Sequence, residues 1–265
     1  MPVRRDPSGR RSVEAEVEVS GTPEQVWQAI ASGPGISSWF VPTKLEERVG
    51  GVTVSSFAPG GSMDSHATIT QWEPPHHFVA EAEEGPGTVA TEWTVEAKAG
   101  GTCTVRVVHS WFADTDDWDG QFEGHSFGWQ SFFAILRLYL AHFQGRNGVP
   151  VQLMAMSKQA TQTAWDALVR PLGLADARVG ARVATPETAP ELSGVVEIVN
   201  PPEWPGLILR IDKPIPALAH LFALPMGGPV MLPVRFYLYG DEAPAMAGEV
   251  EAVWQMWLGA RFPPA

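Results

Sequence analysis

His109 has the clearest capacity for chemistry in an apolar setting. It stands in the segment 102–112, and the other residues that share its face of a strand are Cys103, Val105, Val107 and Trp111. Residues two apart in a strand share one face, so we expect His109 to point inward with these neighbours. There it could orient a ligand carbonyl or hydroxyl, or shuttle a proton, because its pKa is near neutrality. The alternative is a neutral core histidine, hydrogen-bonded to a neighbour and without chemistry.

Aromatic residues elsewhere in the first half could complete a pocket around His109. Apolar pockets with a few placed polar groups are the usual form of a small-molecule site. The expected ligand-binding residues are Trp39, Phe40, Thr91, Trp93, His109, Trp111, Trp129, Phe133 and Leu136. The alternative is that these side chains simply fill a core, as large aromatics usually do.

Other candidate sites in the sequence are weaker. The acidic loop at 114–120 resembles a calcium loop, but Thr115 takes the first ligand position and Ser126 takes the twelfth, where a glutamate is needed. His76 and His77 lack the further ligands of a zinc site. Cys103 has no adjacent base and should be an inert packed thiol. We therefore expect no metal and no cofactor.

Several catalytic signatures are missing from the sequence. It contains no G-x-S-x-G, H-E-x-x-H, C-x-x-C or G-x-G-x-x-G motif and no phosphate-binding loop. This argues against the common hydrolases, metalloproteases and dinucleotide enzymes.

Composition excludes further classes of protein. The 265 residues are 45% hydrophobic with a net charge of −12, which is too apolar for a disordered chain and too acidic for a nucleic-acid binder. No apolar run is long enough for membrane insertion. A single cysteine is typical of a reducing compartment, so we expect a cytoplasmic protein. Residues 1–11 carry four arginines without a following apolar stretch, which predicts a disordered tail.

The elements that must position these residues follow from hydrophobic periodicity. Residues 13–19 alternate as a strand, and Thr22, Pro23 and Gln25 predict the capped start of a helix that ends at 33–35. A very short helix is expected at 36–40. Turn residues then separate antiparallel strands at 43–49, 52–57, 66–72, 77–83, 89–99 and 102–112. A largely buried helix follows at 121–144 and should lie in the curve of the sheet.

The second half of the chain repeats this pattern. Strand 151–156 and helix 158–169 echo the start of the chain, residues 194–202 echo 67–75, and a final helix follows Gly248. Residues 218–223 are expected to form a short helix in place of a strand. We infer two related domains, 12–147 and 148–265, of which the second is a degenerate copy.

A set of short motifs resembles a known superfamily. The motifs are Thr22–Trp27, Trp39–Pro42, Trp72–Pro75, His109–Ser110 and Gly128–Ser131. Together they resemble the START-like helix-grip superfamily, also called SRPBCC, and in detail the branch similar to the C-terminal domain of the activator of the heat-shock protein 90 ATPase. The resemblance covers about residues 12–145. The second half resembles the fold more faintly, and Leu238 stands where His109 would fall.

The resemblance implies an α+β fold in which a curved antiparallel sheet grips a long C-terminal helix. Family members often hold a lipid, sterol, polyketide or other apolar molecule between sheet and helix. We therefore expect the first domain to bind a small apolar or amphipathic molecule, of lipid-like, polyketide-like or aromatic-like kind, in a cavity between its sheet and its long helix. Two alternatives stay open: a cyclase, aromatase or dehydratase that uses His109 as acid/base, and a chaperone adaptor with a protein partner. A homodimer is a further expectation.

Overall fold

The computed structural model describes residues 3–61, 63–84, 87–112, 119–225 and 227–263, with side chains left out over 119–127. The chain divides into two compact units, residues 1–57 with 61–146, and residues 58–60 with 147–265. Residues 114–118 of the calcium-like loop lie outside the described residues, as do the side chains of Asp119 and Ser126. Each unit is α+β, as the sequence predicts.

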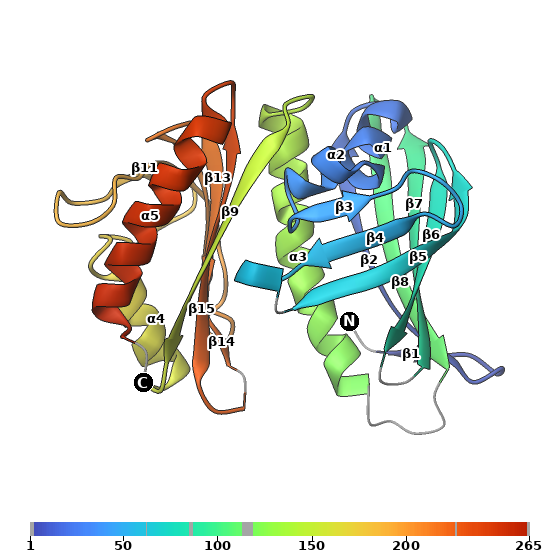
Figure 1. The fold of residues 1–265 in the computed structure, drawn as a ribbon, viewed down its shortest axis with the longest axis horizontal. Coiled ribbons are helices and arrows are strands. Elements are labelled where there is room, and N and C mark those ends of the chain that lie inside the picture. The colour runs from blue at the N-terminus through green and yellow to red at the C-terminus, as the bar shows by residue number, and fades with distance from the viewer. Residues whose placement is uncertain (1–2, 62, 85–86, 113–118, 226, 264–265) are drawn as a thin grey trace. The chain divides into compact units, whose positions relative to one another are not determined.

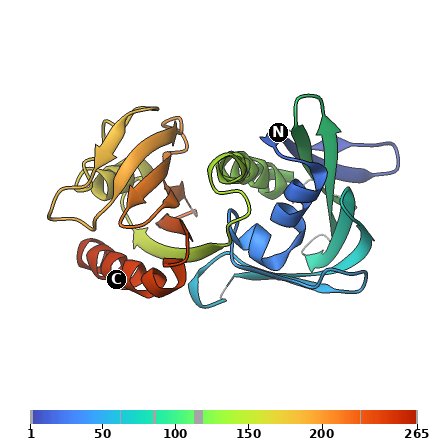
Figure 2. The ribbon, with the colours of Figure 1, turned by 90° about the horizontal axis from the view of Figure 1, so that it is seen from above.

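The first unit is an eight-stranded antiparallel sheet with a long helix against it (Figure 1). Its elements are β1 (Arg4–Arg5), β2 (Arg10–Ser20), α1 (Pro23–Ala31), α2 (Gly33–Ser37), β3 (Thr43–Leu45), β4 (Val52–Ser56), β5 (Asp64–Glu73), β6 (His77–Glu84), β7 (Gly87–Lys98), β8 (Thr102–Phe112) and α3 (Asp119–His142). The strand order is β1-β2-β8-β7-β6-β5-β4-β3, so the second strand pairs with the last. In Figure 2 the sheet curves around α1 and α2, and α3 runs beside them.

Helix α1 begins as the sequence predicts. The Gln25 amide donates to the Thr22 hydroxyl, and the Gln25 side chain accepts from the Thr22 amide at 2.9 Å. This reciprocal pair is a capping box, which satisfies two backbone donors that a helix start leaves open.

The segment 33–35 begins a helix instead of only ending one. Ser32 accepts a hydrogen bond from the Gly35 amide at 3.1 Å and so caps α2, which starts three residues earlier than expected. Proline suits this first turn because no intrahelical partner awaits its missing N–H group. A Cβ at Gly35 would lie 1.8 Å from the Gln28 carbonyl oxygen, so the tight turn requires glycine.

The prediction of a disordered tail over 1–11 is wrong for the residues that the structure describes there. β1 pairs with β2 through Arg4↔Ser12 and Arg5↔Arg11, and Asp6 closes the turn by accepting from the Ser8 amide at 2.8 Å. Arg10 and Arg11 continue the ladder with β8. The tail is ordered because its backbone groups find partners on an open sheet edge.

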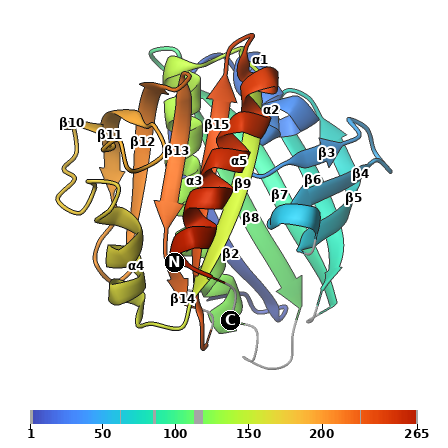
Figure 3. The ribbon, with the colours of Figure 1, turned by 60° about the vertical axis from the view of Figure 1, so that its left-hand side comes forward.

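The second unit repeats the order of the first. Its elements are β9 (Gly148–Ser157), α4 (Thr161–Val169), β10 (Arg182–Ala184), β11 (Ser193–Val199), β12 (Gly206–Lys213), β13 (Ala217–Phe222), β14 (Leu224–Pro225), β15 (Val230–Tyr239) and α5 (Ala243–Arg261). The first strand, β9, again pairs with the last, β15, and β13, β12, β11 and β10 follow in the sheet (Figure 3). The tandem helix-grip architecture is thus present in both halves.

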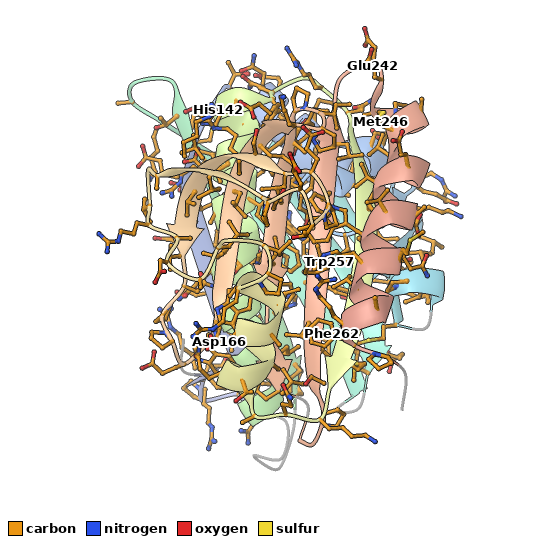
Figure 4. The ribbon with its side chains drawn as sticks, turned by 90° about the vertical axis from the view of Figure 1, so that its left-hand side faces the viewer. His142, Asp166, Glu242, Met246, Trp257 and Phe262 are labelled. Carbon is orange, nitrogen blue, oxygen red and sulfur yellow. The ribbon has the colours of Figure 1, made fainter. Side chains whose placement is uncertain are left out.

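Two expectations for the second half are wrong. Residues 217–222 form strand β13, because their place between β12 and β15 satisfies the backbone on both edges. Helix α5 begins at Ala243, so Gly248 lies inside it. Its inner side carries Trp254 and Trp257 into an apolar core that also contains Trp165 from α4. Trp257 is labelled on α5 in Figure 4.

Candidate functional site

His109 lies on the inward face of β8 and is half-buried. Its strand neighbours are Val13 on β2 and Thr91 on β7. The Trp129 indole N–H on α3 donates to His109 Nε2 at 2.7 Å, and Thr91 Oγ1 lies 2.9 Å from His109 Nδ1. A sheet and a helix that are remote in sequence therefore hold one imidazole between them.

These contacts fix the protonation state of His109. An indole N–H only donates, so Nε2 must be an unprotonated acceptor. The neutral ring then carries its hydrogen on Nδ1 and donates it to Thr91 Oγ1. The Thr91 hydroxyl stands at the end of this chain and can direct its own hydrogen to another acceptor.

An aromatic cluster continues inward from Trp129. Trp129 stacks on Phe40 with ring centroids 5.2 Å apart and meets Trp93 edge-on at 5.2 Å. Trp39 lies 6.3 Å from Trp93 and 6.4 Å from Phe133, and its indole donates to the Ala29 carbonyl at 2.8 Å. Offset and edge-on ring pairs of this kind stabilise beyond the area they bury. The side chains are buried in contact with one another.

Seven of the nine expected ligand-binding residues are joined by these contacts: Trp39, Phe40, Thr91, Trp93, His109, Trp129 and Phe133. Trp111 packs one step further along β8, against Val13 and Val89. Leu136 is fully buried on α3. Thr91 and His109 meet because β7 and β8 pair in the register that puts them opposite each other. The ligand-binding role of these residues stays a prediction.

Sequence reasoning missed two parts of this face. Trp27, Trp72 and Phe78 form a second aromatic group, which reaches the first through the stacking of Phe78 on Trp93. Arg11 was placed in the tail, yet it is 5% exposed and follows the inward alternation of β2. Extending the alternation of residues 13–19 back by one step would have found it.

The inward face is otherwise apolar. On β2, β7 and β8 the inward positions are the odd-numbered residues 11–19, 89–97 and 103–111. Apart from the indole N–H groups of Trp93 and Trp111, the strong hydrogen-bonding groups among them belong to Arg11, Thr91 and His109. Cys103 is buried, its Sγ donates to the Gly21 carbonyl at 3.3 Å, and burial raises the pKa of its thiol. The thiol therefore has the inert environment that the sequence predicts.

Hollows on the opposite face of this sheet are less suited to an apolar molecule. Two open depressions of about 360 Å³ each are lined by outward side chains, among them Glu81 and Thr88, which both depressions share. His77 Nε2 lies 3.2 Å from Glu92 Oε1 in one of them. Carboxylates in the lining place negative charge in these depressions, whereas the inward positions of β2, β7 and β8 carry no carboxylate.

The described residues contain no group of three or more histidine, cysteine, aspartate or glutamate side chains that could hold a metal ion. Among the helices of the described part of the chain, none has both the length and the apolar character that crossing a membrane requires.

Among the residues of the second unit that the structure describes, no counterpart of this polar chain is found. Leu238 on β15 pairs with Ala217 and Val149, where His109 pairs with Thr91 and Val13. The polar residues of β13 and β15, His220, Arg235 and Tyr237, alternate with the core residues and so belong to the opposite face. Burial lowers the pKa of His220 to about 3 and keeps its ring neutral.

Several solved structures are similar to the chain. DynU16, from the dynemicin biosynthetic locus, is 17% identical over 94% of this chain and 96% of its own, with a TM-score of 0.43. The di-domain ARO/CYC BexL from the BE-7585A biosynthetic pathway is 12% identical over 96% and 99%, with a TM-score of 0.44. The Aha1 dimer from Colwellia psychrerythraea is 16% identical over 51% and 98%, with a TM-score of 0.41.

A comparison with curated proteins found no match. Residues 10–142, half of the chain, match the family described as polyketide cyclase/dehydrase and lipid transport. This range contains the whole sheet of the first unit from β2 onward, with α3. The chain therefore belongs to the polyketide cyclase/dehydrase and lipid transport family, and the predicted START-like helix-grip resemblance is confirmed.

Proposed function

We propose that the first unit binds a small apolar or amphipathic molecule, of lipid-like, polyketide-like or aromatic kind, on the inward face of its sheet. The observation that carries this proposal is the chain Trp129–His109–Thr91, set in a face that is otherwise almost entirely apolar. Apolar surface with a few placed polar groups is the usual composition of a small-molecule site. Thr91 and His109 are both half-buried, so part of each residue is exposed at this face.

Thr91 is the group that would meet the polar end of the ligand. Its oxygen accepts from His109 Nδ1, which leaves the hydroxyl hydrogen to be donated to a ligand carbonyl or hydroxyl oxygen. Trp129 and His109 act as positioning residues, because their hydrogen bonds hold the Thr91 hydroxyl in place. The neighbouring aromatic rings supply the apolar wall.

Titration with dihydroxyanthraquinone, a planar polyketide-like molecule that quenches tryptophan fluorescence, tests this assignment. We expect Thr91→Val to raise Kd about 5-fold, the value of one neutral hydrogen bond. Thr91→Ser should bind like the parent protein. Thr94→Val is the matched control, because it makes the same substitution in β7 at an outward position. Equal affinity of the Thr91 and Thr94 valine variants would contradict the assignment.

If the protein is instead a cyclase, aromatase or dehydratase, His109 must act as the acid/base. An acid/base role needs a ring nitrogen that can exchange a proton with the ligand, yet Trp129 occupies Nε2 and Thr91 occupies Nδ1. His109→Ala should then abolish turnover and spare binding, whereas the binding role predicts weaker binding. The homodimer, the chaperone partner and the cytoplasmic location stay predictions.

A further inference from the structure

Arg11 places a cation on the inward face beside the polar chain. Burial along β2 alternates at Arg11, Val13 and Ala15, so these three side chains share the face that carries His109. Arg11 pairs with Trp111, and Val13 pairs with His109. Arg11 and His109 are therefore diagonal neighbours, about 7 Å apart between Cβ atoms and within reach of a long side chain.

Among the described residues, the charge at the inward positions of β2, β7 and β8 is of one sign, positive. The inward positions of β2, β7 and β8 include no aspartate or glutamate, and Arg11 is their one full charge. A guanidinium offers two parallel N–H donors that match a carboxylate, and this pairing strengthens where water is scarce. Arg11 already takes part in an interaction within the chain, which a ligand would share or replace.

We propose that Arg11 makes the ligand site of the first unit selective for molecules that carry a carboxylate. The inference rests on the proposed function and narrows it to apolar acids, such as a fatty acid or an aromatic acid. The apolar part would lie on the aromatic cluster, the carboxylate on Arg11, and any second oxygen on Thr91.

Displacement of a neutral reporter tests the selectivity on the full chain. N-phenylnaphthylamine fluoresces in apolar sites and carries no charge. The competitors are two matched pairs, dodecanoate with dodecanol and naphthoate with naphthalenemethanol, so that lipid-like and aromatic acids are compared separately. We expect the acid of at least one pair to displace the reporter at about 10-fold lower concentration than its alcohol, as a charge-assisted hydrogen bond would produce.

Arg11→Gln should remove this preference, because the variant loses the charged guanidinium that would pair with a carboxylate. Arg10→Gln is the matched control. Arg10 is the adjacent arginine, but it is exposed and its Nη2 donates to Ser110 Oγ on the outward side at 2.8 Å. An Arg11→Gln variant that keeps the preference would overturn the proposal.

The parent protein gives an answer that does not depend on the folding of any variant. A bound reporter that acids and alcohols displace equally would overturn the carboxylate inference and leave the ligand site standing. A reporter that does not bind, or that no competitor displaces, would overturn the proposed function as well.

Discussion

Two histidines of this chain differ in their surroundings and therefore in the interactions they make. His109 has a partner at each ring nitrogen and lies where a ligand could reach its neighbour Thr91. His220 is buried on β13, stacks on Phe222 at 4.4 Å, and has no hydrogen-bond partner at either nitrogen. The first is built into a polar chain, and the second is held neutral by burial and by the nearby positive charge of Arg235.

The low pKa of His220 predicts a pH-dependent stability. The unfolded chain takes up a proton near pH 6.5, but the folded protein resists protonation down to about pH 3. The contribution of neutral His220 to the free energy of unfolding is therefore fully present above pH 6.5. This contribution is lost as the pH falls from 6.5 toward 3. At pH 5 the loss is about 2 kcal/mol. The free energy of unfolding, measured with urea at pH 8 and at pH 5, should differ less between the two pH values for His220→Leu than for the parent protein. Replacing the exposed His66 with leucine should leave the pH difference of the parent protein unchanged.

At the scale of elements, the short helix α2 decides where Trp39 and Phe40 lie. The Phe40 amide donates to the Ile36 carbonyl at 2.9 Å, so the two aromatics leave the end of α2 in a fixed direction. The start of that helix depends on Gly35, whose Cα faces the Gln28 carbonyl oxygen. The position of the aromatic cluster thus depends on a residue that has no side chain.

Alanine at Gly35 should destabilise the protein by about 2 kcal/mol or more, because the added methyl group overlaps backbone. The same substitution at Gly248 should stabilise it by up to about 1 kcal/mol, because that glycine lies inside α5 with open space around its Cα. Thermal unfolding of the two variants measures both effects. If both substitutions changed the unfolding temperature in the same direction, the result would contradict the structure.

Periodicity and turn residues predicted most elements of the first unit, with β8 at its observed bounds and the capping box of α1. They failed where pairing with other strands decides the conformation. The strand β13 depends on β12 and β15, and the ordered segment at 4–11 depends on β2 and β8. The link from Trp129 to His109 had no local signal, because a helix and a strand supply its two ends.

At the scale of the whole molecule, one fold occurs twice with different interiors. The first unit keeps polar groups on its inward face, whereas the second has an apolar core with Leu238 and Ala217 at the equivalent strand positions. The two units thus share the order of their strands and differ in the side chains on their inward faces.

The chain should therefore bind one ligand molecule and not two. Native mass spectrometry of the intact protein with dihydroxyanthraquinone should show a single bound molecule at saturation. His109→Leu, which gives the first unit the residue of the second, should lower that occupancy. Two molecules bound with similar affinity would contradict a single site.

The β1–β2 hairpin has a practical consequence for anyone who trims this protein. Sequence patterns place the start of the first domain at residue 12, and a shortened chain beginning there would keep the eight residues of β2 that follow Ser12 in its pairing with β8. It would lose Arg11. Such a truncated protein could fold, crystallise and pass every check of integrity, yet give a false negative in a screen for acidic ligands.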